Sequence, residues 1–452
     1  MSIPQADCVT NLLSSAVPSL QLEKSPRFSF DMLGVAGLLD GDDAVCAMAT
    51  VHIYGNRLWL GWYNNPGSFQ IAKRLSSFAK STSFPSIFGR SPSLPKSIYV
   101  DPSTLFDSNR CSGPKFRATH SGTVIEETSH LAALFMKECA SRDSEGKVVP
   151  GRRTQPVGIT IADLGHAPAS EMLPTYTSVS TLFFASVPIA TSIGACALCA
   201  VCEDWYASSL ILVGIAASGV SSLVLGSATL VFRHPEPAKG SPAGDGILGS
   251  DKDIVILKGT EGAVNSITRG TFTLRFSSKA HRNLLRWCSI LFFIQCITQL
   301  LLIPQASLFG QLMFLASLAV SALYSTRISS LNEEMIHQKL LFERVLENPT
   351  LTKYTLGTRT TAVVFTLLVL RPQDPMKLLN ELLPNDTKVW REWKATISEQ
   401  LRHPDGQSFL SESKLGDLDG FAQQEQDLLH LLYEDARAAY NGYMDYLRTD
   451  SL

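Results

Sequence analysis

The sequence is poor in charged residues. Only 18% of its 452 residues are Asp, Glu, Lys or Arg, and 45% are hydrophobic; a soluble chain usually carries about 25% charged residues. Either this fold buries a very large core or part of the chain lies in lipid. The 39 basic and 41 acidic residues nearly cancel, to a net charge of −2. The chain as a whole therefore lacks the electrostatic basis for nucleic-acid binding, and we expect no nucleic-acid partner.

Motifs that carry catalysis are also missing. The sequence has no G-x-S-x-G, H-E-x-x-H, phosphate-binding P-loop or kinase motif set. Its nine cysteines show no disulfide spacing, which fits a reducing cytosol. Cys196, Cys199 and Cys202 recur every three residues, but a zinc site needs a fourth ligand, so we interpret them as packing residues. We predict no catalytic, cofactor-binding or metal-binding residue.

What the sequence does contain is four long runs without a charged residue. Two of them, 181–202 and 206–232, have 22 and 27 residues, and two more, 287–303 and 307–324, have 17 and 18. A helix rises about 1.5 Å per residue and a bilayer core is about 30 Å thick, so the first pair spans it easily and the second pair is at the short end. We predict a mainly α membrane protein with four transmembrane helices. The alternative for each run is a buried helix of a soluble core.

Very short connections join these runs in pairs. Residues 203–205 link the first pair and residues 304–306 the second, which predicts two antiparallel helical hairpins. The segment between the hairpins, 233–286, contains nine Lys and Arg, whereas the two turns contain none. Basic residues favour the cytoplasmic side, so we expect this segment and both termini in the cytosol. The N-terminal stretch lacks the pattern of a secretory signal peptide, and the sequence does not indicate which organelle is involved.

The spans leave 368 residues outside the membrane. We expect five regions: a cytosolic N-terminal region of mixed α/β structure (1–180, with a basic Ser/Pro-rich linker at 67–100), a first hairpin (181–232), a cytosolic loop (233–286), a second hairpin (287–324) and a helical cytosolic C-terminal region (325–452).

Two shorter segments have patterns of their own. In the loop, the sequence predicts a small β-α-β module: a strand at 254–257, a helix capped by Thr260 and closed by Gly270, and a strand at 271–276. In the C-terminal region, residues 360–370 are apolar but too few to cross a bilayer. That segment suits a buried strand or a core helix.

Small residues repeat along two of the predicted spans. The second span has one at every fourth position: Gly214, Ser218, Ser222 and Gly226. The first span has a similar ridge: Ser186, Ala190 and Gly194. Small side chains let two helices approach closely in lipid, so we predict that these ridges pack against each other.

Three glutamines are the most polar residues inside the two spans of the second hairpin. Gln295 and Gln299 share a helical face of the third span, and Gln311 follows early in the fourth. Gln299 and Gln311 are at comparable depth from the turn, so we expect their amides to bond across the hairpin. The alternative is a polar permeation path, which is disfavoured because no Asp, Glu, Lys, Arg or His lies inside a span.

The N-terminal region carries a β-rich stretch and a basic one. Residues 45–54 and 57–62 flank Gly55-Asn56, which predicts a β-hairpin. Residues 69–80 (FQIAKRLSSFAK) form an amphipathic pattern within a stretch that has six basic and no acidic residues. As a helix, this segment would place Lys73, Arg74 and Lys80 where they can contact anionic lipid head groups. The alternative is a solvated helix or charge run.

The loop DIVILKGTEGAVNSITRGTFTLRF, the segment IPQASLFGQLMFLASLAVSALYS, and downstream GTRTTAVVFTLLVL and KLLNELLPNDTKVW resemble a group of uncharacterised fungal multi-span membrane proteins. The resemblance covers about residues 206–393 and implies residence in a membrane, without an activity, a ligand or site residues. We therefore expect a membrane-anchored interaction or scaffold protein with partners on the cytosolic side. A transporter or channel subunit is the first alternative, and a membrane-bound enzyme with an unrecognised site is the second.

Overall fold

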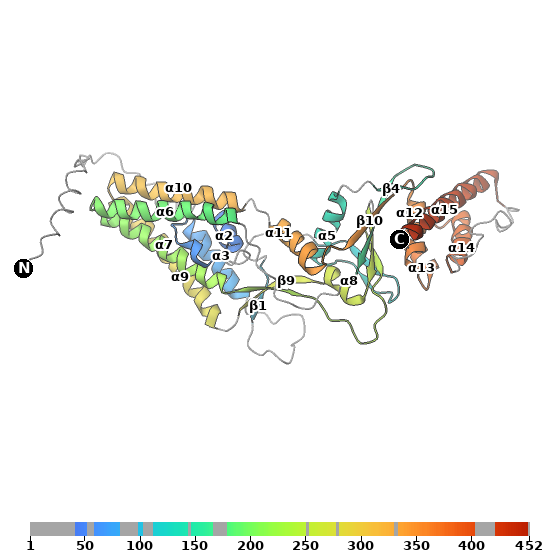
Figure 1. The fold of residues 1–452 in the computed structure, drawn as a ribbon, viewed down its shortest axis with the longest axis horizontal. Helices are drawn as coiled ribbons and strands as arrows, with labels where there is room; N and C mark the ends of the chain where they lie inside the picture. Colours follow the sequence, from blue (N-terminus) through green and yellow to red (C-terminus); the bar gives the residue numbers. More distant parts are fainter. Residues whose placement is uncertain are drawn as a thin grey trace, which may run out of the picture.

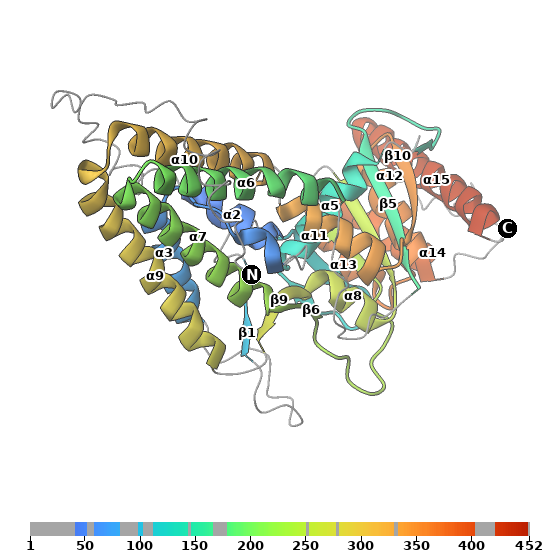
Figure 2. The ribbon, with the colours of Figure 1, turned by 60° about the vertical axis from the view of Figure 1, so that its left-hand side comes forward.

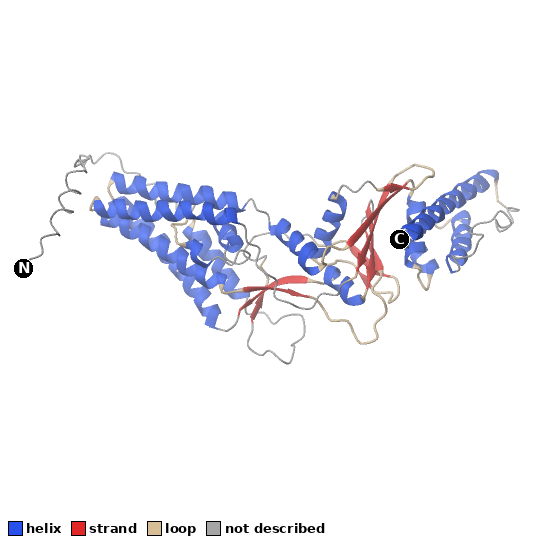
Figure 3. Ribbon diagram, viewed as in Figure 1, coloured by secondary structure: helices blue, strands red, loops and turns tan. Residues whose placement is uncertain are grey.

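A computed structural model describes residues 41–51, 58–81, 98–102, 112–142, 146–165, 179–249, 253–276, 280–329, 333–402 and 421–450. The protein is mostly helical with some sheet, as predicted. Figure 1 shows two parts along the longest axis: a bundle of long helices at one end and an α/β body at the other. Figure 3 shows that the strands gather in the body and at its junction with the bundle.

Four helices form the bundle: α6 (Val179–Val201), α7 (Trp205–Gly226), α9 (Ala280–Leu302) and α10 (Leu308–Ser329). Each is long and apolar enough to cross a membrane, so the four predicted apolar helices are present as candidate membrane spans. The second helix is shorter than the predicted span 206–232, because α7 ends at Gly226 and Thr229–Arg233 forms strand β6 instead. The β-branched and aromatic residues of that segment pair with another strand, and this pairing prevails over an apolar composition that also suits a helix.

The bundle helices do not pack as two independent pairs. α6 lies between α10 and α7, and α7 packs in turn against α9. α9 and α10 diverge from their shared turn, as Figure 2 shows. The N-terminal helices α2 (Asp42–Ala49) and α3 (Ser68–Ser81) lie in the space between them, α2 on α10 and α3 on α9.

The predicted N-terminal β-hairpin is wrong. Residues 42–49 are helical, and the short 3-10 helix η3 (Leu58–Gly61) precedes α3; residues 52–57 lie outside the described part. Ala44, Ala47 and Met48 are buried, and small side chains let α2 approach α10 closely. The predicted helix at 69–80 is confirmed, but its apolar face is buried within the protein. Of the predicted linker 67–100, residues 82–97 lie outside the described part.

The α/β body is built on a seven-stranded sheet in the order β3-β2-β7-β8-β5-β10-β4. In chain order the strands are β2 (Lys115–Ala118), β3 (Val124–Ile125), β4 (Lys147–Val148), β5 (Val157–Leu164), β7 (Gly246–Gly249), β8 (Asp253–Gly259) and β10 (Thr350–Leu356). β5 runs parallel to β8 and antiparallel to β10. The strands come from segments before, between and after the membrane helices, so these segments fold together as one body.

Each face of this sheet has its own core. Val255 and Leu257 of β8 face α5 (His130–Ser141), α8 (Glu261–Thr268), α11 (Glu333–Leu340) and the π-helical turn η5 (Leu341–Val345). Ile254 and Ile256 face α12 (Arg359–Leu370), α13 (Pro375–Leu382), α14 (Lys388–Arg402) and α15 (Gln423–Asp450). This alternation follows from the pleat, which turns successive side chains to opposite faces.

The short apolar segment 360–370 is a core helix. It forms α12, whose N-cap Thr358 accepts a hydrogen bond from the backbone N–H of Thr361, and all residues from Thr360 to Leu370 are buried. α12 packs between the sheet and α15. A helix this apolar on all sides needs cover on all sides, and the body supplies it.

The predicted β-α-β segment forms the expected elements, but its strands separate. Thr260 caps α8, accepting a hydrogen bond from the backbone N–H of Ala263. β8 belongs to the seven-stranded sheet, whereas β9 (Thr271–Phe276) joins β6 and β1 (Ile98–Val100) in a three-stranded sheet beside the bundle. α8 therefore leads the chain from the body back to the membrane helices.

A buried carboxylate offers a test of how the body is held together. Asp435 of α15 is 2% exposed and accepts hydrogen bonds from Arg152 (Nη2 to Oδ2, 2.8 Å) and from the Thr358 hydroxyl (3.1 Å). We expect Asp435→Ala to lower the free energy of unfolding by about 2 kcal/mol, because both donors lose a buried charged partner. Urea unfolding followed by tryptophan fluorescence measures this. Asp445→Ala, which removes an exposed ion pair with Arg448, is the control and should change little.

Candidate functional site: a buried polar cluster in the bundle

The turn between η3 and α3 enters the middle of the bundle. Asn64, Asn65 and Ser68 are fully buried there, although the surrounding helices are apolar. Pro66 and Gly67 shape the turn, and Gly67 has a φ of 69°, a left-handed conformation that glycine adopts without strain. A helix begins directly after this Asn-Asn-Pro-Gly sequence. The chain therefore turns inside the bundle and continues there as α3, which packs on α9.

Asn64 bonds to three of the four membrane helices. Its backbone N–H donates to the Ser192 hydroxyl of α6 (3.0 Å), and its side-chain Nδ2 donates to the Ser317 hydroxyl of α10 (3.1 Å). Its Oδ1 accepts from Nε2 of Gln295 on α9 (3.3 Å). One uncharged side chain and its own backbone thus join helices that are far apart in the sequence.

Asn65 bonds to the fourth helix, α7. Its Nδ2 donates to the Ser218 hydroxyl of α7 (2.8 Å), which in turn donates to the carbonyl of Gly61 (2.7 Å). The Ser68 hydroxyl donates to Oε1 of Gln299 on α9 (3.0 Å). We call these residues the polar cluster: Asn64, Asn65, Ser68, Ser192, Ser218, Gln295, Gln299 and Ser317. None of them carries a charge, so the cluster suits structural hydrogen bonding and has no group for acid–base chemistry.

The glycines of α7 make room for this turn. A Cβ atom on Gly214 would lie 2.0 Å from Oδ1 of Asn64, and one on Gly219 would lie 2.3 Å from the Trp62 ring. Small residues on α7 therefore admit the N-terminal turn. Ser222 and Gly226, the other members of the predicted ridge, are buried further along the same helix.

The ridge on the first span does not meet this surface. Ser186 and Ala190 are exposed, and a Cβ on Gly194 would meet nothing within 4 Å. The expected face-to-face packing of the two ridges is therefore not what the structure has. α6 and α7 meet elsewhere, for example where the Ser208 hydroxyl donates to the carbonyl of Cys196 (3.2 Å). The spacing of small residues indicated close packing but not which segment fills the space.

The expected bond between Gln299 and Gln311 is replaced by other contacts. Gln311 donates through Nε2 to the carbonyls of Ile303 and Ala306 (3.1 Å each), so it closes the turn before its own helix. Gln299 bonds to Ser68 of the N-terminal turn. The two amides take separate partners because α9 and α10 diverge from that turn.

A single carboxylate ties the two short turns together. Oδ1 of Asp204 accepts from the backbone N–H of Ala207 at the start of α7 (3.1 Å). Its Oδ2 accepts from the backbone N–H and the hydroxyl of Ser307 (2.7 and 2.5 Å), just before α10. Both turns therefore lie at the same end of the bundle. A helix N-cap at Asp204 was the available signal in the sequence, but its second partner was not visible there.

The polar cluster lies near the middle of the bundle. Ser192 and Ser317 are each about ten residues from these turns, which at about 1.5 Å per residue is about 15 Å along the helix axis. This is about half the thickness of a bilayer core. In a bundle that spans a bilayer, the N-terminal turn, which the sequence placed outside the membrane region, would reach the depth where unpaired polar groups are most costly.

Of the three cations predicted to contact lipid, one is paired inside the protein and two are exposed. Arg74 is half-buried, and its Nε donates to Oδ1 of Asp42 at the start of α2 (3.0 Å). Lys73 and Lys80 are exposed on α3. The structure thus gives Arg74 a partner inside the protein and leaves the two lysines on the surface.

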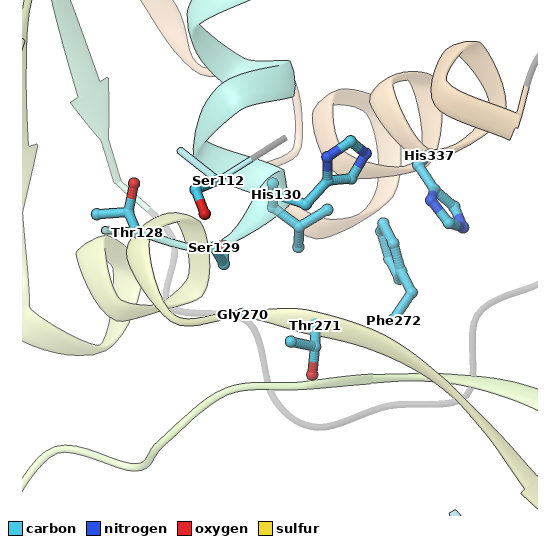
Figure 4. A pocket seen from close by; sticks show the side chains of 9 residues that line it. Ser112, Thr128, Ser129, His130, Gly270, Thr271, Phe272 and His337 are labelled. Atoms are coloured by element: carbon cyan, nitrogen blue, oxygen red, sulfur yellow. The ribbon is translucent and has the colours of Figure 1, made fainter. Parts of the chain in front are cut away.

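The body contains a small polar pocket of about 210 Å³. Figure 4 shows His130 of α5 and His337 of α11 on one side of it, with Phe272 beneath. The Thr128 hydroxyl donates to the carbonyl of Pro114 (2.6 Å), and the Ser129 hydroxyl donates to the carbonyl of Ile267 (2.8 Å). Since a nucleophilic hydroxyl must give its proton to a base, neither hydroxyl is arranged for catalysis.

A larger cleft of about 950 Å³ opens at the carboxyl ends of the parallel strands β5 and β8. Its lining includes four acidic side chains: Asp163, Glu236, Asp245 and Glu261. Asp245 is fixed, since its Oδ1 accepts from the backbone N–H of Gly259 (2.7 Å). In the described part of the chain no group of three His, Cys, Asp or Glu residues is arranged to hold a metal ion. The acidic lining suits a basic ligand rather than a phosphate.

Gly214 and Gly194 form a matched pair for testing the cluster. We expect Gly214→Ala to lower the free energy of unfolding by about 2 kcal/mol, because the new methyl group displaces Asn64 from its three hydrogen bonds. Gly194→Ala adds the same methyl group to open space in a neighbouring membrane helix and should change little. The melting temperatures of the two variants in detergent measure the difference. Equal melting temperatures would contradict the placement of the turn.

Cys139 of α5 offers a test in the body. Burial raises the pKa of its thiol to about 12, so the thiol stays protonated at ordinary pH. We expect iodoacetamide at pH 8 to leave Cys139 unmodified in the folded protein and to modify it after denaturation. The exposed Cys202 is the internal control in the same digest. Similar modification of both cysteines in the folded state would show that α5 is not packed as described.

Comparison with protein-family models, with curated proteins and with solved structures finds no match to this chain. The resemblance to fungal multi-span membrane proteins therefore stays a prediction, and function has to be inferred from the geometry of the bundle and the body.

Proposed function

We propose that the chain is a membrane-anchored interaction protein. Its bundle holds the α/β body at the cytosolic face of a membrane, and the body binds protein partners there. The membrane helices are arranged as two connected pairs with both short turns on the far side, and both termini are cytosolic.

The hydrophobic core shared by bundle and body carries this proposal. One continuous cluster of buried side chains includes Phe292 of α9 and Phe78 of α3 in the bundle, and Leu248 and Leu257 in the seven-stranded sheet. The connections are short as well: two residues separate α7 from β6, and three separate β9 from α9. A body joined to its anchor in this way keeps one orientation towards the membrane, which is what a docking platform requires.

The charge distribution supports the orientation. The turns joined by Asp204 contain no Lys or Arg, whereas the segment 233–286 at the body's end contains nine. Because basic residues favour the cytosolic side, the body is the cytosolic part.

The polar cluster supports anchoring over transport. Gln295 and Gln299, the residues on which a pore between copies would depend, bond to Asn64 and Ser68 of the same chain. Gln295 and Gln299 are also 0% and 1% exposed, so their amides are enclosed by the chain itself and do not face a neighbouring subunit.

Asn385 tests the orientation. It begins the sequon Asn385-Asp386-Thr387, and its side chain is exposed between α13 and α14, where a glycosyltransferase could reach it. We expect Asn385 to remain unmodified, because the body faces the cytosol. The measurement is a glycosidase-sensitive mass shift in cells, with a sequon-bearing insertion after the exposed Gln305 as the positive control. Glycosylation at Asn385 would place the body on the opposite side.

The interaction role is tested by site-specific photocrosslinking in cells. A photoreactive residue at Glu236, on the acidic cleft, should give discrete protein adducts, and one at the lipid-facing position Leu198 should not. Asp163→Lys and Glu261→Lys together should abolish the adducts at Glu236, since a basic partner loses its counter-charges. Adducts that are the same at Glu236 and Leu198 would contradict a platform in the body.

A further inference from the structure

α3 keeps one exposed stripe although most of its surface is buried. Ile71, Leu75 and Phe78 are covered by the protein. The exposed positions recur every three or four residues and thus share one helical face: Phe69, Lys73, Ser77 and Lys80. A helix whose other faces are packed in the bundle therefore turns two lysines and a phenylalanine outwards.

The contacts of α3 with α9 fix the depth of this stripe. Ser68 bonds to Gln299, and the carbonyl of Ala72 accepts from the Ser289 hydroxyl (2.7 Å), so α3 runs antiparallel to α9 from the middle of the bundle towards the body. Lys73 is therefore about level with Trp287, whose side chain is 62% exposed. Exposed tryptophans mark the interface between the hydrocarbon and the head groups.

The stripe therefore changes from apolar to basic along the membrane normal. Phe69 lies about 6 Å deeper than Lys73, within the hydrocarbon, and Lys80 lies about 10 Å beyond Lys73, towards the body. The neighbouring surface of α9 contributes apolar side chains at the deeper level, since Phe293 and Ile294 are 48% and 45% exposed. An acyl chain fits the deep part of this surface, and an anionic head group fits the basic part.

Nearby acidic groups do not neutralise the two lysines. Asp42 of α2 bonds to Arg74, and Asp43 accepts from the Thr326 hydroxyl of α10 (2.9 Å). Among the residues that the structure describes, neither Lys73 nor Lys80 has an ion-pair partner. Their charges are therefore available to a ligand.

We propose that this stripe of α3 binds one anionic phospholipid of the leaflet next to the body. The phosphate lies between Lys73 and Lys80, and an acyl chain lies along Phe69 and the exposed side of α9. The amphipathic helix thus does not rest flat on the membrane surface, because its apolar face packs on α9 and its basic edge holds a lipid upright. The inference depends on the membrane placement of the bundle and is independent of the platform role of the body.

Native mass spectrometry of the purified full chain in neutral detergent tests this directly. With phosphatidylserine as the probe we expect one retained lipid, bound more tightly than phosphatidylcholine. The Lys73→Gln/Lys80→Gln variant should bind phosphatidylserine about 30-fold more weakly, because two surface cations are lost. Lys73→Arg/Lys80→Arg keeps the charges and should keep the lipid. Lys239→Gln, which removes an exposed lysine of the body, is the control and should bind as the unaltered protein does.

Three results would overturn the proposal. The first is equal binding of phosphatidylserine and phosphatidylcholine. The second is a double Gln variant that still prefers phosphatidylserine over phosphatidylcholine. The third is displacement of the lipid by soluble glycerophosphoserine, which would show that a free phosphate ester is sufficient for binding. Phe69→Ala keeps the proposal testable if the lysine variants fail to fold, because it leaves every charge in place. It should weaken the binding of both lipids, since the contact with the acyl chain is lost. Unchanged lipid binding in Phe69→Ala contradicts the upright pose.

Discussion

A polar group in the apolar interior of a helical bundle has to find hydrogen bonds inside the protein, and the turn at Asn64 bonds to all four long helices. Asn64 reaches α6, α9 and α10, and Asn65 reaches α7. Apolar surface provides no drive for helices to associate in lipid, so such bonds and close packing have to fix the arrangement. This turn needs space inside the bundle. The divergence of α9 from α10 and the glycines of α7 provide that space, and α3 continues from the turn along α9.

The bundle and the body form one structure because the chain passes repeatedly between them. The seven-stranded sheet takes strands from before α6, from between α7 and α9, and from after α10. Separate cytosolic domains on flexible linkers would move independently of the membrane, whereas Phe78, Phe292 and Leu257 here belong to one core. The orientation of the acidic cleft relative to the bundle is thereby set by the fold itself.

The sequence was sufficient wherever one physical signal dominated. Four charge-free runs predicted the four long apolar helices, Thr260 marked the start of α8, and Gly270 lies two residues beyond its end at Thr268. It was insufficient where the environment decides the outcome. Residues 45–51 are rich in β-formers yet are helical against α10, and Asn64-Asn65-Pro66-Gly67 has the composition of any exposed turn. The partners of these asparagines lie 128 to 253 residues away, a relation that no local pattern expresses.

That separation has a consequence for how the protein is made. Asn64 is synthesised 253 residues before Ser317, so at about 5 to 20 residues per second its last partner emerges about 10 to 50 s later. Throughout this interval the turn has no complete set of hydrogen bonds, so in the proposed membrane placement it would not settle stably in lipid. In that placement the N-terminal turn would enter the bundle last, after α10 is inserted, although it is synthesised before all four long helices.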